Sequence, residues 1–170
     1  NVGQDHVDSF MDYLVDAEKE PGRIHTQGEK VEKTSIRDAD IYPIDRKQVR
    51  LYEILNKIAV SANKYFKYDI NGIEVANIIH YKAPSNGYSY HIDIGPEGTA
   101  ALRKISMSLL LNDDYEGGEI CFRSSEKENC TRPKAGEVVA FSSFISHKVN
   151  PITRGDRYVV VAWFTGPPFR

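Results

Sequence analysis

Seven short segments rich in β-branched and aromatic residues follow one another from residue 75 onward, and turn residues separate each from the next. The turns contain Gly, Pro, Asn and Asp, as in residues 84–87 and 133–136. We predict strands at residues 75–82, 88–94, 104–111, 119–123, 137–141, 147–150 and 157–164. Short strands joined by tight turns are typical of an antiparallel barrel or sandwich.

Helical patterns precede these strands. Apolar residues recur with helical spacing in residues 7–17 and again, more strongly, in residues 45–68. Asp45 and Gln48 match a capping box at the start of the second helix. Residues 18–33 read as a polar loop, with short edge-strand pieces at 34–36 and 41–42. We therefore predict one α+β domain over residues 1–170, with residues 1–73 as mainly helical support and residues 74–170 as the β core.

Composition excludes several classes of function. A formal net charge of -2 gives no basic surface for nucleic acid, and no apolar run reaches the length of a membrane span. The first residues show no signal peptide, so we expect a cytoplasmic protein. Cys121 and Cys130 flank a hairpin loop; we expect free thiols, with a disulfide as the alternative. The sequence contains no Cys-x-x-Cys pair, so we do not expect these cysteines to form a zinc site.

The sequence His91-Ile92-Asp93 places an imidazole and a carboxylate on the same face of a strand, because side chains alternate along strands. His147 follows much later in the chain. Two histidines and one carboxylate are the ligands that hold Fe(II) in non-haem oxygenases, with further positions open. Arg157 opens the last apolar run, and its planar fork could bind a carboxylate through two hydrogen bonds. The alternatives are a structural His91–Asp93 pair and an exposed Arg157, with Arg154 as the rival arginine.

An ordered set of motifs extends this pattern over more than half the chain. The set consists of Tyr81, His91–Asp93, Leu111–Glu119, Pro133–Gly136, His147, Arg157–Tyr158 and Trp163. It resembles the prolyl 4-hydroxylase-type branch of the Fe(II)/2-oxoglutarate-dependent dioxygenases, and within it the bacterial PKHD-type hydroxylases. The resemblance implies a double-stranded β-helix, a jelly-roll or cupin-like barrel, with the N-terminal helices packed on one sheet.

The resemblance also implies roles for single residues. His91, Asp93 and His147 would be the catalytic metal ligands, and Arg157 would bind the distal carboxylate of 2-oxoglutarate. Residues expected to line the co-substrate pocket are Tyr81, Ile120, Val149 and Trp163, with core packing as the alternative for Tyr81 and Trp163. Leu110 stands where many prolyl hydroxylases have a second tyrosine, which leaves one hydrogen bond to the co-substrate unassigned. We expect substrate contacts from Tyr88, Tyr90 and Arg103 at the mouth of the site.

The function implied is hydroxylation of a C–H bond with Fe(II), 2-oxoglutarate and O2 as cofactors and ascorbate as a stimulant. A prolyl residue of a peptide or protein is the favoured substrate, and a free amino acid or other small molecule is the alternative. A cupin-like metal barrel without 2-oxoglutarate is the rival class. Arg157 separates the two classes, because a barrel that does not bind a dicarboxylate has no need of it. The sequence predicts no partner from nucleic acid or membrane and does not predict the oligomeric state.

Overall fold

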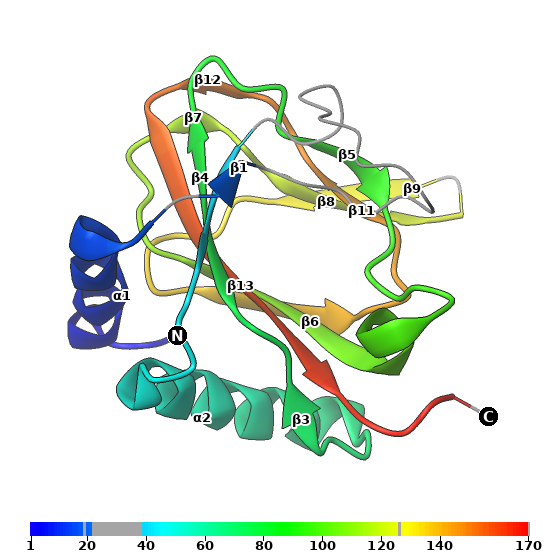
Figure 1. Ribbon diagram of the computed structural model, residues 1–170. Helices are drawn as coiled ribbons and strands as arrows, with labels where there is room; N and C mark the ends of the chain where they lie inside the picture. Colours follow the sequence, from blue (N-terminus) through cyan, green and yellow to red (C-terminus); the bar gives the residue numbers. More distant parts are fainter. Residues whose placement is uncertain (19, 22–38, 126, 170) are drawn as a thin grey trace.

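The computed structural model describes residues 1–18, 20, 21, 39–125 and 127–169 of the chain, which form two helices and facing antiparallel sheets (Figure 1). The helices are α1 (Gln4–Asp16) and α2 (Val49–Phe66). The large sheet has the order β1 (Glu20–Pro21), β2 (Asp40–Pro43), β4 (Asn77–Lys82), β13 (Asp156–Thr165), β6 (Arg103–Leu110) and β10 (Val138–Ser142). A further short strand, β3 (Gly72–Ile73), pairs with the end of β13.

A smaller sheet faces the large one. Its order is β5 (Tyr88–His91), β11 (His147–Val149), β8 (Ile120–Ser124) and β9 (Lys127–Thr131). A two-stranded ribbon of β7 (Glu116–Gly117) and β12 (Ile152–Arg154) closes one end, and a 3-10 helix, η1 (Gly98–Leu102), precedes β6. Figure 1 shows both α-helices on one side of the β4–β13–β6 sheet and the small sheet on the other. The predicted combination of N-terminal helices with a following run of antiparallel strands is confirmed from α2 onward, whereas β1 and β2 lie between the two helices.

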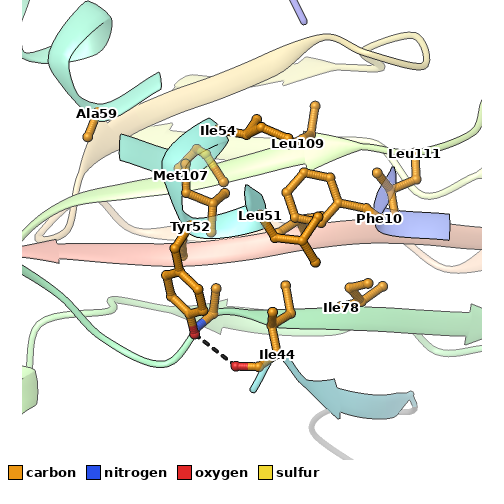
Figure 2. Packing of buried hydrophobic residues seen from close by; sticks show 14 of the residues in the cluster. Phe10, Ile44, Leu51, Tyr52, Ile54, Ala59, Ile78, Met107, Leu109 and Leu111 are labelled. Atoms are coloured by element: carbon orange, nitrogen blue, oxygen red, sulfur yellow. Dashed lines mark hydrogen bonds between the residues drawn. The ribbon is translucent and has the colours of Figure 1, made fainter. Parts of the chain in front are cut away.

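The main core lies between the helices and the large sheet (Figure 2). Leu51 and Leu55 from the apolar stripe of α2, with Phe10 from α1, pack against Ile78 and Leu109 of the sheet. Each such side chain contributes about 1.5–3 kcal/mol when fully buried. This burial fixes the large sheet from behind and leaves its other face to the small sheet.

The structure corrects the predicted start of α2. The helix begins at Val49, and Gln48, at the N-cap position, makes no side-chain capping bond. The Asp45 carboxylate instead accepts a hydrogen bond from the backbone N–H of Lys47 at 2.8 Å, so it stabilises the preceding turn. The capping-box prediction is therefore wrong, because the same acceptor can serve a local turn as readily as a helix end.

All seven predicted strands are present, with shifted ends. The predicted strand 88–94 ends at His91, and β9 was not predicted. Ile41 and Tyr42 lie in β2, as expected. Most of the predicted loop 18–33 lies outside the described residues; its described part is residue 18 and Glu20–Pro21, which form β1. The predicted strand piece 34–36 also lies outside the described residues. Neither of the two helices of the described part is long and apolar enough to span a bilayer.

The two cysteines form a disulfide, which corrects the expectation of free thiols. Cys121 in β8 stands directly opposite Cys130 in β9, with the Cα atoms 4.0 Å apart. The sequence did not reveal this register because β9 is exposed along its whole length and shows no apolar alternation. The bridge joins the outer hairpin of the small sheet.

Candidate active site

The three predicted ligands come together at the edge of the small sheet. His91 at the end of β5 stands directly opposite His147 in β11. Asp93 follows two residues after His91, and its two carboxylate oxygens lie 3.4 Å from His91 Nε2 and 3.6 Å from His147 Nε2. One ligand atom of each residue lies within 4.8 Å of the others. Three donor atoms therefore converge on one point, as a facial triad requires.

Backbone carbonyls orient both imidazoles. His91 Nδ1 lies 2.8 Å from the carbonyl oxygen of Ser89, and His147 Nδ1 lies 2.9 Å from that of Ile145. A carbonyl can only accept, so each Nδ1 donates its proton there, and each Nε2 is the ring nitrogen that faces Asp93 and is available to a metal ion. Ring contacts hold these orientations, with Tyr88 stacked on His91 at 3.8 Å and Phe141 against His147 at 4.5 Å between ring centroids. The donor set is thus pre-oriented for a divalent cation.

The Asp93 carboxyl is kept ionised. Burial alone would raise its pKa, but the hydrogen bond from His91, the charge of His147 and the Ser106 hydroxyl together outweigh burial, and the pKa lies well below its usual value. An ionised carboxylate in a nearly closed site is a ligand for a cation rather than a proton carrier.

A cavity extends from this cluster into the space between the sheets. Its lining includes the three ligand candidates and the five other residues predicted for the co-substrate pocket: Arg157, Tyr81, Ile120, Val149 and Trp163. The register explains the grouping. Arg157 of β13 lies opposite Tyr81 of β4, and Val149 of β11 lies opposite Ile120 of β8. The large sheet thus supplies the arginine, and the small sheet supplies both histidines.

Arg157 is almost fully buried, with 1% of its surface exposed. Its Nε and Nη1 atoms have no hydrogen-bond partner among the described residues. The guanidinium carbon lies 5.4 Å from the centre of the Tyr81 ring and 5.9 Å from that of Tyr115. Burying an unpaired cation is costly, so this arginine has the surroundings of a group that binds an anion. The alternative of an exposed arginine is wrong, and Arg154 is the exposed one, paired with Glu116 at 2.5 Å.

Tyr115 is a residue that sequence reasoning missed. It is buried, and its hydroxyl also lacks a partner among the described residues. Leu110, the position where a second tyrosine was sought, is buried opposite Val159 and has no polar side-chain group. The only signal for Tyr115 was its place in the motif before Gly117-Gly118, where it has no strand or helix periodicity.

Gly118 lets Arg157 and Tyr115 approach one another. Its φ is +69°, and a Cβ there would stand 2.8 Å from Arg157 Cδ and 3.1 Å from Tyr115 Cε2. Only a glycine combines this backbone conformation with such close contact.

The three predicted substrate contacts are placed differently from one another. Tyr88 lines the cavity, whereas Tyr90 and Arg103 are not among its lining residues. The Tyr90 hydroxyl donates to Glu128 on the outer side of the hairpin. Arg103 binds Glu74 and the carbonyl oxygen of Asp93.

Comparison with known proteins agrees with this geometry. Residues 76–165 match the 2OG-Fe(II) oxygenase superfamily. A PKHD-type hydroxylase of Synechococcus sp. (strain CC9902) is 38% identical over 80 residues, which cover 46% of this chain and 36% of that protein. The chain thus matches little more than a third of the length of this curated relative.

Solved structures show the same fold. A prolyl-4-hydroxylase of Pseudomonas putida superposes with a TM-score of 0.77 at 21% identity, covering 98% of this chain and 89% of that one. A prolyl hydroxylase of Trichoplax adhaerens, solved with a peptide fragment of hypoxia inducible factor, gives 0.73 at 20% identity, covering 95% and 77%. These likenesses confirm the predicted double-stranded β-helix with helices on one sheet.

Proposed function

The chain belongs to the 2OG-Fe(II) oxygenase superfamily, and on that premise we propose that it hydroxylates a prolyl residue of a peptide or protein with 2-oxoglutarate as co-substrate. The co-substrate assignment rests mainly on Arg157, which is buried in the same cavity as the His91–Asp93–His147 cluster and whose Nε and Nη1 atoms have no hydrogen-bond partner among the described residues. A cupin-like metal barrel would leave that charge without a use.

The donor set fits Fe(II). His91 Nε2, His147 Nε2 and a carboxylate oxygen of Asp93 would hold the ion on one side and leave the cavity side open. Fe(II) held there with 2-oxoglutarate supplies the chemistry that converts the co-substrate and O2 into succinate and CO2 and transfers one oxygen atom to the substrate. The protein contributes binding, orientation and exclusion of water.

Each wall of the cavity has a part in that work. Arg157 would bind the distal carboxylate through its Nε and Nη1 donors. Tyr115 is not among the lining residues, but its ring centre lies 5.9 Å from the Arg157 guanidinium carbon, and its hydroxyl would supply the hydrogen bond that Leu110 cannot make. Ile120 and Val149 form an apolar wall, which strengthens the charge pairing by keeping water out.

A prolyl substrate is supported by two observations. Two of the solved structures with the same fold are named as prolyl hydroxylases, and one of these was solved with a peptide. The cavity lining also contains three aromatic side chains, Tyr88, Phe141 and Trp163, whose apolar surface suits an uncharged ring. A small-molecule substrate is the competing assignment.

The experiment that tests this function begins without oxygen. We expect Fe(II) and 2-oxoglutarate together to give a visible metal-to-ligand charge-transfer band, and admission of O2 to give succinate. A panel of proline-containing peptides, assayed with and without ascorbate, should yield a product heavier by one oxygen atom. Succinate without any modified peptide would reject the prolyl substrate. Bound metal with neither band nor succinate would reject the co-substrate.

Gly118→Ala should impair both folding and co-substrate binding. The new Cβ would push Arg157 and Tyr115 apart, in addition to the roughly 1–2 kcal/mol cost of a side chain in the left-handed region. Gly98→Ala is the matched control, because Gly98 has a φ of +61° and no atom within 4 Å of its added Cβ. In Gly118→Ala the midpoint temperature of thermal unfolding and the apparent affinity for 2-oxoglutarate should both fall. In the control both should fall only modestly or not at all. Equal effects of the two substitutions would contradict the role given to Gly118.

A further inference from the structure

We propose that Glu74 and Arg103 form a positioning pair that holds the Asp93 ligand in place from behind the metal site. The inference rests on the proposed role of Asp93 as a metal ligand. It assigns to Arg103 a task other than substrate contact, and it gives Glu74, which no sequence motif singled out, a part in the site.

Asp93 needs such support because it lies beyond the end of its strand. The ladder between β5 and β11 ends at the His91–His147 pair. Beyond it, the backbone N–H groups of Asp93 and Ile94 both donate to the carbonyl oxygen of Ser143, at 2.9 and 3.0 Å. The carbonyl of Asp93 faces the other way and accepts a hydrogen bond from Arg103 Nη1 at 2.9 Å. The backbone that aims the carboxylate is thus held on both sides by groups that do not touch the metal site.

Arg103 is itself fixed on three sides. Its Nε and Nη2 atoms donate to the two carboxylate oxygens of Glu74, each at 2.7 Å, which is the bidentate geometry of an arginine–carboxylate pair. The guanidinium carbon lies 4.1 Å from the centre of the Trp163 ring. Both side chains are mostly buried, with 18% and 15% of their surfaces exposed. With Glu74, Asp93 and Trp163 engaged, the guanidinium is occupied inside the protein.

Glu74 connects this arrangement to the large sheet. Its backbone N–H donates to the carbonyl oxygen of Trp163 in β13 at 3.0 Å. A series of hydrogen bonds from β13 through Glu74 and Arg103 to Asp93 therefore links the sheet that carries Arg157 to the loop that carries the candidate ligand.

The charges of the pair also suit a neighbouring cation. An arginine alone beside the ligand would repel a divalent ion, whereas the Glu74 carboxylate neutralises it at close range. The pair can then supply a directed N–H group to Asp93 without a net positive charge. Loss of Glu74 would release the arginine from its position and leave its charge uncompensated.

The test uses metal affinity rather than turnover. Arg103→Lys keeps the charge but cannot bind Glu74 and Asp93 at once, and Glu74→Gln keeps the shape but removes the neutralising charge. We expect each variant to bind Co(II), titrated anaerobically by its visible absorption without 2-oxoglutarate or substrate, roughly 10- to 100-fold more weakly than the parent chain. At saturating Fe(II), the KM for 2-oxoglutarate, measured by succinate formation, should stay close to that of the parent chain.

Controls separate the outcomes. Glu116→Gln breaks the exposed pair with Arg154 and should leave Co(II) binding unchanged. Circular dichroism reports whether each variant folds. If Arg103→Lys does not fold, the Co(II) affinity of Glu74→Gln decides the test. Parental Co(II) affinity in both variants would overturn the proposal, and so would a raised KM for 2-oxoglutarate at parental metal affinity. Parental affinity in Asp93→Ala would instead reject the metal site itself.

Discussion

His147→Ala should abolish metal binding and succinate formation while the barrel still folds. In the proposed site His147 would supply one of three ligand atoms, and its Nε2 lies 3.6 Å from a carboxylate oxygen of Asp93. Removing the ligand itself should weaken metal binding by more than the roughly 10- to 100-fold that loss of an outer-shell partner costs. The measurement is anaerobic Fe(II) or Co(II) titration, followed by succinate release under O2.

His80→Ala is the matched control. His80 neighbours Tyr81 in β4 but faces away from the cavity, where it binds Asp156 at 2.6 Å and stacks on Tyr158. This variant should lose some stability and keep its metal affinity. If both alanine variants bound metal alike, the assignment of His147 would fail.

Arg157→Ala should raise the 2-oxoglutarate requirement steeply. Truncating one partner of a buried, hydrogen-bonded charge pair costs about 2–5 kcal/mol, which is at least about 30-fold in affinity. Arg157 is the buried cation with unpartnered donors on the described cavity wall, so no other residue of that wall can replace it. The measurement is apparent affinity for 2-oxoglutarate at saturating Fe(II).

Selectivity makes this result specific. A 2-oxo acid of similar length without the distal carboxylate should be a poor co-substrate for the parent chain, and Arg157→Ala should lose the preference between the two acids. Tyr115→Phe, which removes one neutral hydroxyl, should weaken binding by only about 2- to 10-fold. Arg154→Ala, at an exposed position, should match the parent. An unchanged preference in Arg157→Ala would count against a carboxylate-binding role.

The sequence predicts the strands and two of the three candidate ligands because these depend on local patterns. Residues typical of strands, bounded by turn residues, locate β6, β8 and β13, and the His-x-Asp spacing keeps His91 and Asp93 close together. Register is a different matter. His91 stands opposite His147, and Arg157 stands opposite Tyr81, because segments far apart in the sequence pair with each other. The order of the motifs is compatible with these pairs but does not by itself predict the register.

Contacts without a local pattern were out of reach. Glu74 and Arg103 are 29 residues apart, and neither stands in a recognisable motif. Cys121 and Cys130 meet because of a polar edge strand that carries no apolar signal. Tyr115 lies between strands, where side-chain direction follows from the backbone path rather than from periodicity.

The division of the site between two sheets has a mechanical consequence. The histidines belong to the small sheet, and Arg157 belongs to the large one. A dicarboxylate held at one end by the metal and at the other by Arg157 would act as a cross-brace between them. The distance between the sheets would then select for the length of the dicarboxylate. The midpoint temperature of thermal unfolding should be higher when the dicarboxylate is bound.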